Sequence, residues 1–460
     1  MVPMLETRAL NLTLDFCLRV GELLLASGAG AADVTSTMQT LAWHFGVRYP
    51  DIDVTFTALS MSYQSDPEEP PLLQVRHVKQ REIDYEDLTL VDQLVREVIA
   101  DRVDLVEARA TLARIVSSGH STPRWVTSLA WGFMCSGVGI LLGGDFTVVA
   151  IAFLAAVCID RLQLLMARRR MPFFYQQVAG GVVATLLAAA AAAVGAVDNP
   201  SLVITANIVM MLAGIGFMGA LQDALSGFYV TAGARLTEAL LATAGIIAGV
   251  SGGLTVADVA GVELRRVGLG VTSWETLTPI ALGAALCAGA FAFASYAPRR
   301  SILPIAAVAG LAIMIQQSIA IQGFGRAWPT ALAAFFVGLI SFTVAGRLKV
   351  PPLVVVVSAV VPMLPGLSIY RGLALMAEGG TATSQGLLSM ITAASVAIAL
   401  SSGVILGEYV AQPLKREARR LESRLAGPRL VGPLRSGRPR RTRSGRATSR
   451  HSRRTAPPAP

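Results

Sequence analysis

The stretch Val360–Gly372, VVPMLPGLSIYRG, ends a nearly uninterrupted apolar run that begins at Pro351. Pro362 and Pro365 each lack a backbone N–H and clash with the preceding helical turn, and Gly366 adds flexibility, so regular helix is not expected here. In lipid, a broken helix is tolerated only where protein or a water-filled cavity satisfies the freed backbone groups. The stretch therefore predicts either a proline kink used for packing or a helix break at a binding site.

The composition around this stretch is that of a membrane protein. Of 460 residues, 53% are hydrophobic and only 15% are charged, which excludes an ordinary soluble globular protein. A helix needs about 20 apolar residues to cross a hydrocarbon core ~30 Å thick. The sequence predicts a mostly α-helical, polytopic membrane protein with about ten spans, at residues 125–143, 145–160, 178–197, 201–221, 236–257, 276–297, 302–321, 328–346, 352–371 and 386–410. The second span is short.

Residues 1–120 contain no such span and predict a small cytoplasmic α+β domain. Amphipathic stripes indicate two helices, alternating stretches on either side of DPEEPP indicate a strand hairpin, and two more amphipathic helices follow, in the order ααββαα. Charged residues interrupt the amino-terminal apolar positions, so the apolar centre of a signal peptide is missing.

The carboxyl-terminal residues 412–460 hold 15 Lys and Arg but two acidic residues. Such a segment has almost nothing to bury and is expected to be a disordered cytoplasmic tail. Nucleic-acid binding is one interpretation of the tail; attraction to anionic membrane lipid is favoured.

The spans divide into two halves, residues 121–258 and 276–411, with matching gaps when the chain is shifted by about 152 residues. At that shift MLAG, 211–214, falls on MLPG, 363–366. Because each half has an odd number of spans, the halves enter the membrane in opposite orientations, as in the inverted repeats of secondary transporters. Basic residues concentrate in the loops on one side, which predicts that both termini are cytoplasmic in a multi-pass plasma-membrane protein.

The repeat and the helix break indicate a substrate site, because half-helix ends at a break bind charged groups. The candidate substrate-binding residues are Pro362, Pro365, Gly366, Ser368 and Arg371, with Gly214 in the first half. Arg371 either offers a fixed cation to a substrate carboxylate or anchors the span at the interface. Since the first half lacks the proline, the sharper break is expected in the second.

Three charged residues of the first half are candidates for coupling transport to protons. Asp223 is either the proton-coupling acid or a helix-end charge, and Arg235 and Glu238 can also pair with each other at i, i+3. Asp145 and Asp160 bracket the second span and are expected to be interfacial.

Enzyme chemistry is disfavoured. Ser27, His44 and Asp51 are a conceivable hydrolase triad in a membrane-anchored enzyme, but no GxSxG motif surrounds the serine. The simpler interpretation of the stretch after Ser27 is a helix turn, with the next helix starting near Ala32 or Asp33. The four cysteines have no metal-binding spacing, so neither disulfides nor zinc nor another cofactor is expected.

Four stretches occur in order around the two halves: LLLASGAGAADV, WGFMCSGVGILLGGD, ALQDALSGFYVTAGARLTEALL and VVPMLPGLSIYRG. Through them, residues 10–410 resemble the threonine/serine exporter family of bacterial and fungal membrane proteins. The resemblance implies a cytoplasmic N-terminal domain, ten helices, and export of L-threonine and L-serine driven by the proton motive force.

The partners implied are a small amino acid, protons and membrane lipid, and a homo-oligomer stays open. Ala213-Gly214 stands where relatives often have Pro-Gly, and Gln222 where a basic residue is common. Related two-polypeptide systems resemble dicarboxylate exporters, so export of small dicarboxylates such as succinate is the alternative.

Overall fold

The computed structural model describes residues 2–66, 68–79, 81–211, 213–262, 276–378, 380 and 382–425, with side chains between residues 8 and 411. Contacts divide the chain into two compact units, Met1–Leu414 and Lys415–Pro460. The predicted disorder of the basic tail concerns residues that lie mostly outside the described ones. The arginines 265 and 266, in the connection between the predicted halves, also lie outside them.

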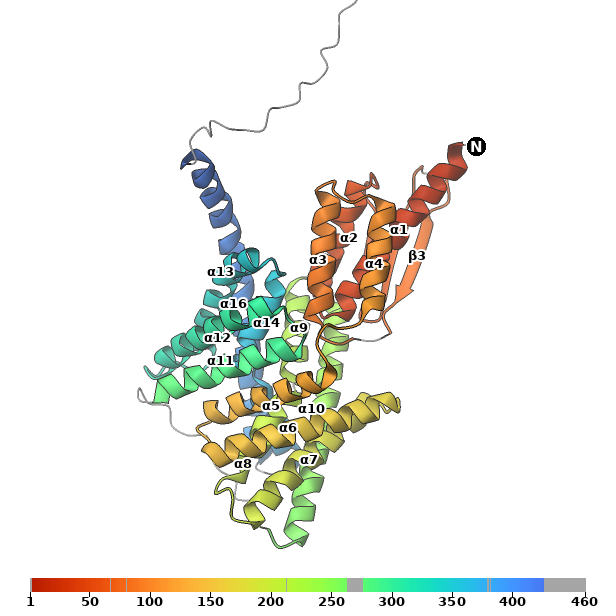
Figure 1. The fold of residues 1–460 in the computed structure, drawn as a ribbon. Coiled ribbons are helices and arrows are strands. Elements are labelled where there is room, and N and C mark those ends of the chain that lie inside the picture. Colours follow the sequence, from red (N-terminus) through yellow and green to blue (C-terminus); the bar gives the residue numbers. More distant parts are fainter. Residues whose placement is uncertain are drawn as a thin grey trace, which may run out of the picture. The chain divides into compact units, whose positions relative to one another are not determined.

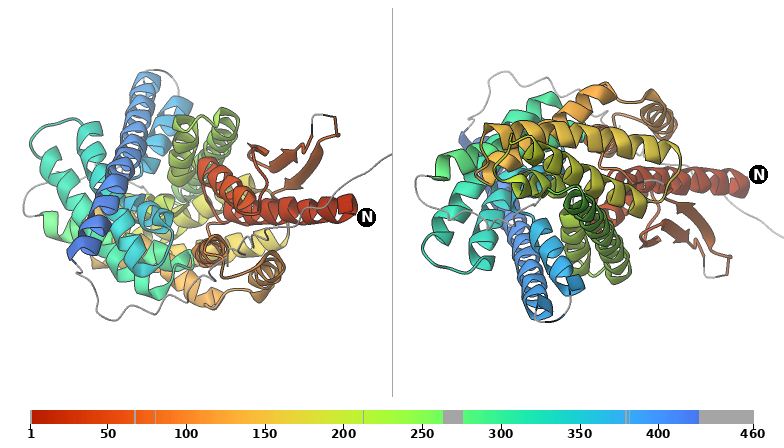
Figure 2. Two further views of the ribbon diagram at one scale, coloured as in Figure 1. Left: turned by 90° about the horizontal axis from the view of Figure 1, so that it is seen from above. Right: turned by 90° about the horizontal axis from the view of Figure 1, so that it is seen from below.

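The N-terminal segment, residues 2–118, consists of four helices and three strands, which Figures 1 and 2 show gathered at the amino-terminal end of the first unit. In order they are α1 Val2–Ala26, α2 Ala31–His44, β1 Asp51–Val54, β2 Ala58–Tyr63, β3 Leu72–His77, α3 Tyr85–Ile99 and α4 Leu105–Ser118. The same compact unit contains this segment and the helices that follow it up to Leu414.

The predicted two-strand hairpin is wrong in its strand count. The strands form an antiparallel sheet in the order β1-β2-β3, with Ile52 opposite Met61 and Met61 opposite Gln74. The first predicted strand is divided because the Thr55 N–H and hydroxyl both donate to the Ala58 carbonyl, which closes a turn. Threonine side chains commonly form such local backbone contacts, and they compete with a continuous strand.

The helices after Ser118 are long and apolar (Figure 1). They are α5 Arg124–Leu141, α6 Phe146–Arg168, α7 Phe173–Ala193, α8 Pro200–Met211, α9 Ala213–Leu225, α10 Tyr229–Val259, α11 Leu277–Ala294, α12 Arg299–Ala320, α13 Ala327–Leu348, α14 Pro352–Val360, the 3₁₀ turn η2 Val361–Met363, α15 Gly366–Glu378 and α16 Ala382–Leu425.

Seven of the described helices are long and apolar enough to cross a membrane, or nine spans if each of two bent helix pairs counts as one. The chain is therefore a multi-pass membrane protein. Helix α5, the first of the ten predicted spans, is not among the nine; it has 18 residues and begins with Arg124. The expectation of a short second span is wrong, because α6 continues past residue 160 to Arg168 over 23 residues.

Helix positions repeat along the chain. Five helices between α5 and α10 each have a counterpart between α11 and α16 that begins 152 to 154 residues later. The paired starts are Arg124 and Leu277, Phe146 and Arg299, Phe173 and Ala327, Pro200 and Pro352, and Tyr229 and Ala382. The regular spacing thus extends from the predicted spans to the helices of the structure.

Glycines allow several of these helices to pack backbone against backbone. A Cβ added to Gly249 in α10 would lie 2.1 Å from the Val178 carbonyl oxygen in α7, and one on Gly407 in α16 would lie 2.3 Å from the Phe335 carbonyl oxygen in α13. Small residues at helix contacts are the usual means of association inside membranes, where apolar side chains gain little by leaving lipid.

Replacing Gly249 by alanine should therefore destabilise the protein. The added methyl group must push α10 from α7, and overpacking of this kind costs about 1–3 kcal/mol. The matched control is Gly252→Ala on the same helix, where an added Cβ meets nothing within 4 Å. Thermal unfolding of the detergent-purified variants should show a lower transition temperature for Gly249→Ala alone; equal temperatures would contradict the close packing.

Candidate functional site

The two bent helix pairs meet at their breaks. The pair α8–α9 bends by 41° and the pair α14–α15 by 47°, so the break in the second half is the sharper, as predicted. A Cβ added to Gly214 in α9 would lie 3.1 Å from the Leu364 Cβ and 3.4 Å from the Gly366 N. Gly214 and Gly366 are the residues that the 152-residue shift places on each other. The predicted substrate-site glycines of the two halves are thus in direct contact.

The second break is a true interruption of the helix. Pro362 lies in the 3₁₀ turn Val361–Met363, Leu364 is extended with φ −62° and ψ 139°, and α15 starts at Gly366, directly after Pro365. Prolines at these places remove backbone donors that a continuous helix would need. The structure therefore favours the broken helix over a simple packing kink.

A small cavity of about 20 Å³ lies beside the two breaks, lined by Ile208, Val209, Thr243, Ile246, Leu364, Gly366 and Tyr370. Its lining comes from α8 and α10 of the first half and from the α14–α15 break of the second. A cavity of this size holds about one water molecule. This cavity is therefore too small for an amino acid in this conformation.

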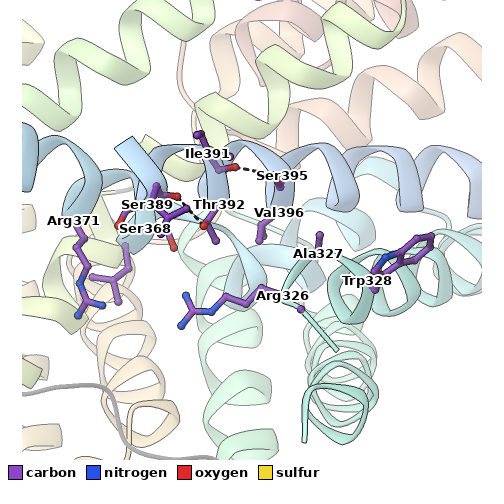
Figure 3. Close-up of a pocket in the computed structure, with 13 residues that line it drawn as sticks. Arg326, Ala327, Trp328, Ser368, Arg371, Ser389, Ile391, Thr392, Ser395 and Val396 are labelled. Atoms are coloured by element: carbon purple, nitrogen blue, oxygen red, sulfur yellow. Dashed lines mark hydrogen bonds between the residues drawn. The ribbon is translucent and has the colours of Figure 1, made fainter. Parts of the chain in front are cut away.

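A larger pocket of about 510 Å³ opens next to α15 and contains Arg371 and Ser368. The other lining residues are Leu367 of α15 and residues before and at the start of α13 and in α16, namely Gly325, Arg326, Ala327, Trp328, Leu388, Ser389, Ile391, Thr392, Ser395 and Val396. Figure 3 shows the Arg326 side chain extending toward the side of the pocket on which Arg371 lies. Both are exposed, and no carboxylate of the part of the chain with described side chains forms an ion pair with either.

The hydroxyl groups of this pocket have a common geometry. Ser389, Thr392 and Ser395 each donate to the backbone carbonyl four residues earlier in α16. Figure 3 shows the bond of Ser395 to Ile391. Each hydroxyl proton is therefore already donated, and the lone pairs of the hydroxyl oxygens can still accept hydrogen bonds. The pocket thus offers cationic donors from two arginines and neutral acceptors from α16.

The predicted coupling residues Asp223 and Arg235 form an ion pair between α9 and α10, with Arg235 Nε 3.1 Å from Asp223 Oδ2. The Asp223 side chain is only 2% exposed. Its Oδ1 accepts the Ala31 N–H at 3.0 Å, 192 residues away in sequence, and Arg235 Nη2 donates to the Ala29 carbonyl oxygen at 3.0 Å. Asp223 is therefore not a free helix-end charge, and the ion pair contacts the N-terminal segment directly.

This contact also determines how α2 begins. Gly30, rather than Ala32 or Asp33, is the N-cap, and it has no side chain to accept an N–H. The Asp223 carboxylate takes that role from another part of the chain, at the positive end of the helix dipole. Gly28 has φ +102°, a conformation that glycine adopts without strain, and so turns the chain toward this contact.

Two more charged side chains stand near the ion pair. The pKa of Asp33 is raised by burial and by the Asp223 carboxylate, although its side chain keeps contact with solvent. Burial, together with the nearby Arg235, lowers the pKa of Arg81 to about 10 against the attraction of Glu238 and Asp223. Glu238 itself is exposed, and the ion pair that Arg235 makes is with Asp223 rather than with Glu238.

The conceivable hydrolase triad is not assembled in the structure. Ser27 is buried, His44 pairs with Asp101 at 3.4 Å, and Asp51 lies in β1 opposite Ser62. No described hydrogen bond joins any two of Ser27, His44 and Asp51. A serine nucleophile would need a base within hydrogen-bond reach.

Asp160, expected at the end of the second span, lies within α6. Its side chain is 6% exposed, pairs with Arg124 Nη2 at 3.2 Å and accepts a hydrogen bond from Ser128, so it joins α6 to α5. The helix continues beyond it to Arg168, which places Asp160 inside the helix rather than at its end. Asp145 is exposed and caps α6 by accepting the Val148 N–H.

Two family models described as threonine/serine exporters match this chain, one at residues 15–257 and the other at residues 281–410. A protein of Mycobacterium tuberculosis named "Probable threonine/serine exporter" is 34% identical over 426 residues, which cover 90% of this chain and 80% of the relative. The "Threonine/serine exporter" of Corynebacterium glutamicum is 31% identical over 415 residues, covering 88% of this chain and 84% of the relative. The chain belongs to the threonine/serine exporter family. It is a transporter and not an enzyme, and no solved structure matches it.

Some site residues of this exporter escaped sequence reasoning. Arg326 was not singled out, although it shares a pocket with the predicted Arg371. Arg81 lies near Asp223, and Ala29 and Ala31 contact Arg235 and Asp223 through backbone atoms that carry no sequence signal. The glycines on either side of Ala29 were the sequence signal that could have indicated this contact, because glycine permits close backbone approach.

Replacing Asp160 by asparagine should destabilise the exporter. The change leaves the Arg124 guanidinium without its carboxylate, and loss of one charged hydrogen-bond partner costs on the order of 1–3 kcal/mol. Asp145→Asn at the start of the same helix is the control, since asparagine caps helices as well as aspartate does. We expect a lower thermal transition temperature for Asp160→Asn and an unchanged one for Asp145→Asn. Equal stability of Asp160→Asn and the parent protein would contradict a structural role.

Proposed function

We propose that this protein exports L-threonine and L-serine from the cytoplasm, driven by the proton motive force, through alternating access between two inverted five-helix halves. The observation that carries the proposal is the contact of Gly214 with Gly366. The contact supports the proposal because inverted-repeat transporters bind their substrates at broken helices where the two repeats meet. The names of the two relatives supply the substrate class.

The transport path in this proposal runs between the two breaks. The cavity there holds about one water molecule, so the halves must part to admit an amino acid. The five helix pairs that begin 152 to 154 residues apart support a relative movement of two similar bodies. Under this proposal the N-terminal segment and both termini are cytoplasmic, and the pocket at Arg371 lies on the opposite, exit side.

The exit pocket suits an amino-acid zwitterion. Arg371 provides donors for the α-carboxylate, with Ser368 beside it, and a guanidinium fork is well shaped for a carboxylate. The α16 hydroxyl oxygens accept from the α-ammonium group. Pro362, Pro365, Gly366 and Gly214 hold the helix ends that form the inner side of this site.

Export of small dicarboxylates is the second candidate, and one observation favours it. The same pocket contains Arg326 as a second cation without an ion-pair partner among the described side chains. Two arginines fit two carboxylates. The relatives' names and the hydroxyl acceptors favour the amino acid.

Proton coupling in this proposal needs a group that binds either a proton or the substrate. Asp223 is the first candidate because it is buried and paired with Arg235, and Glu238 is the second. When a proton or a substrate group displaces one partner of a buried ion pair, the other must find a new contact, which favours a different arrangement of the helices.

Reconstitution into liposomes with an imposed pH gradient tests the function directly. Labelled threonine, serine and succinate are compared, with protein-free liposomes as the control. Threonine and serine flux that follows the pH gradient is expected. Flux of succinate alone supports the second candidate, and the absence of solute flux contradicts transport.

Arg371→Gln should weaken binding of the amino-acid carboxylate at the exit side. Loss of a charge-assisted hydrogen bond of about 1.5–3 kcal/mol corresponds to a KM higher by roughly one to two orders of magnitude. The measurement is uptake of labelled threonine at a series of concentrations, with Arg326→Gln as the comparison in the same pocket. An unchanged KM in Arg371→Gln would show that this arginine only anchors the helix.

Asp223→Asn should uncouple export from the pH gradient while the protein remains in the membrane. An amide cannot take up the transported proton, so an imposed gradient should no longer accelerate threonine flux. Glu238→Gln, one turn from Arg235, separates the two candidates. Gradient-driven flux that survives in Asp223→Asn and disappears in Glu238→Gln transfers the coupling role to Glu238.

A further inference from the structure

Asp223 and Arg235 form hydrogen bonds with the N-terminal segment in the same donor and acceptor directions that a bound zwitterionic amino acid would require. Arg235 donates to the Ala29 carbonyl oxygen, and Asp223 accepts from the Ala31 N–H, both at 3.0 Å. An amino acid carries a carboxylate that accepts and an ammonium group that donates, attached to one carbon atom. Because the Asp223 and Arg235 side chains themselves are 3.1 Å apart, they can hold two such neighbouring groups together.

The second half also has an arginine at the corresponding helix pair. Arg235 lies against Gly219, where an added Cβ would be 2.8 Å from Arg235 Nη1. The 152-residue shift places Gly219 on Arg371 and Arg235 on Leu387. Each half thus carries one arginine at this helix pair, on α10 in the first half and on α15 in the second. Arg371 opens into the exit pocket, whereas Arg235 is covered by the Ala29–Ala31 backbone.

We propose that Asp223 and Arg235 form an entry-side binding site for the α-ammonium and α-carboxylate groups of the exported amino acid, and that the Ala29–Ala31 backbone occupies this site in place of substrate. The inference rests on the proposed export function and identifies the group chemistry that the entry side recognises. Gly30 between the two alanines also lies beside the carboxylate, because a Cβ added to it would be 3.6 Å from Asp223 Oδ1.

The occupant is held in a way that permits exchange. A backbone carbonyl and N–H are neutral, so a zwitterion with full charges makes stronger hydrogen bonds to the same partners. The segment has other anchors that remain when this contact opens, such as the Thr231 hydroxyl donating to the Val54 carbonyl and the Tyr85 N–H donating to the Ser295 carbonyl. Substrate thereby displaces residues 29–31 without releasing the whole N-terminal segment.

The site also selects between the two substrate classes. Asp223 attracts an ammonium group and repels a second carboxylate, and Asp33 adds negative charge beside it. A dicarboxylate is therefore rejected at entry, although the exit pocket holds two arginines. Discrimination by an unfavourable charge is an effective source of specificity.

The direct test removes one hydrogen bond of the occupant. Ala31→Pro deletes the N–H that Asp223 accepts, and proline is tolerated at the first position of a helix when the preceding residue is extended, as Gly30 is with ψ 153°. Equilibrium binding of labelled threonine to the purified full chain should become tighter by about tenfold, because the competing occupant is weakened. Thr231→Val, which removes a neighbouring anchor of the segment, should leave the affinity unchanged.

A second variant keeps the test decisive if Ala31→Pro does not fold. Asp223→Asn should weaken threonine binding about tenfold or more and leave binding of 3-hydroxybutyrate, which lacks the ammonium group, unchanged. Equal losses for both ligands, or a folded Ala31→Pro that binds threonine no more tightly, overturns the entry site. A parent protein that neither binds nor transports threonine contradicts the proposed function instead.

Discussion

A backbone N–H or C=O group inside a membrane must find a partner in the protein, and this constraint shapes the centre of the molecule. Among the described residues, two apolar helix pairs bend by more than 40° at a short break. The break before Gly366 lies against Gly214 at the break of the other half. The two breaks thus cover each other in this structure. In the proposed transport cycle, separating them would expose backbone groups to the path between the halves.

The charged side chains of Asp223 and Arg235 also find partners in another part of the chain. Asp223 and Arg235 lie on helices of the first half, yet each also forms a hydrogen bond with the backbone beside Gly30. The start of α2 in turn depends on Asp223 for its cap. A change at this ion pair is therefore transmitted to the N-terminal segment, which gives a physical reason for one compact unit that includes both.

Much of the helical architecture could be predicted from the sequence, because apolar length and proline and glycine placement act locally. The helix break at Pro362–Gly366 and its counterpart at Gly214 followed from such signals and from the 152-residue spacing. The turn that divides the first predicted strand could not be predicted from these signals, because it depends on the contact of a single threonine. The ion pair of Asp160 with Arg124 in another helix was not predicted either, because spacing along the sequence does not reveal such a pairing.

The candidate site shows the same division. Asp223, Arg235 and Arg371 were identified as candidates from their positions, but their partners come from the N-terminal segment and from Arg326. Tertiary contacts over 192 residues carry no periodic pattern. Backbone partners such as Ala29 and Ala31 are invisible to any argument from residue type.

The most direct measurement of the account is a reversible cross-link between the two breaks. Gly214→Cys and Gly366→Cys are combined in a chain whose cysteines at 17, 135, 158 and 287 are replaced, and threonine flux is measured before and after oxidation. The account predicts that the disulfide forms and stops flux, and that flux returns when the disulfide is reduced. The reason is that the breaks touch in the closed state and must separate during transport. Full flux through the cross-linked protein would contradict it.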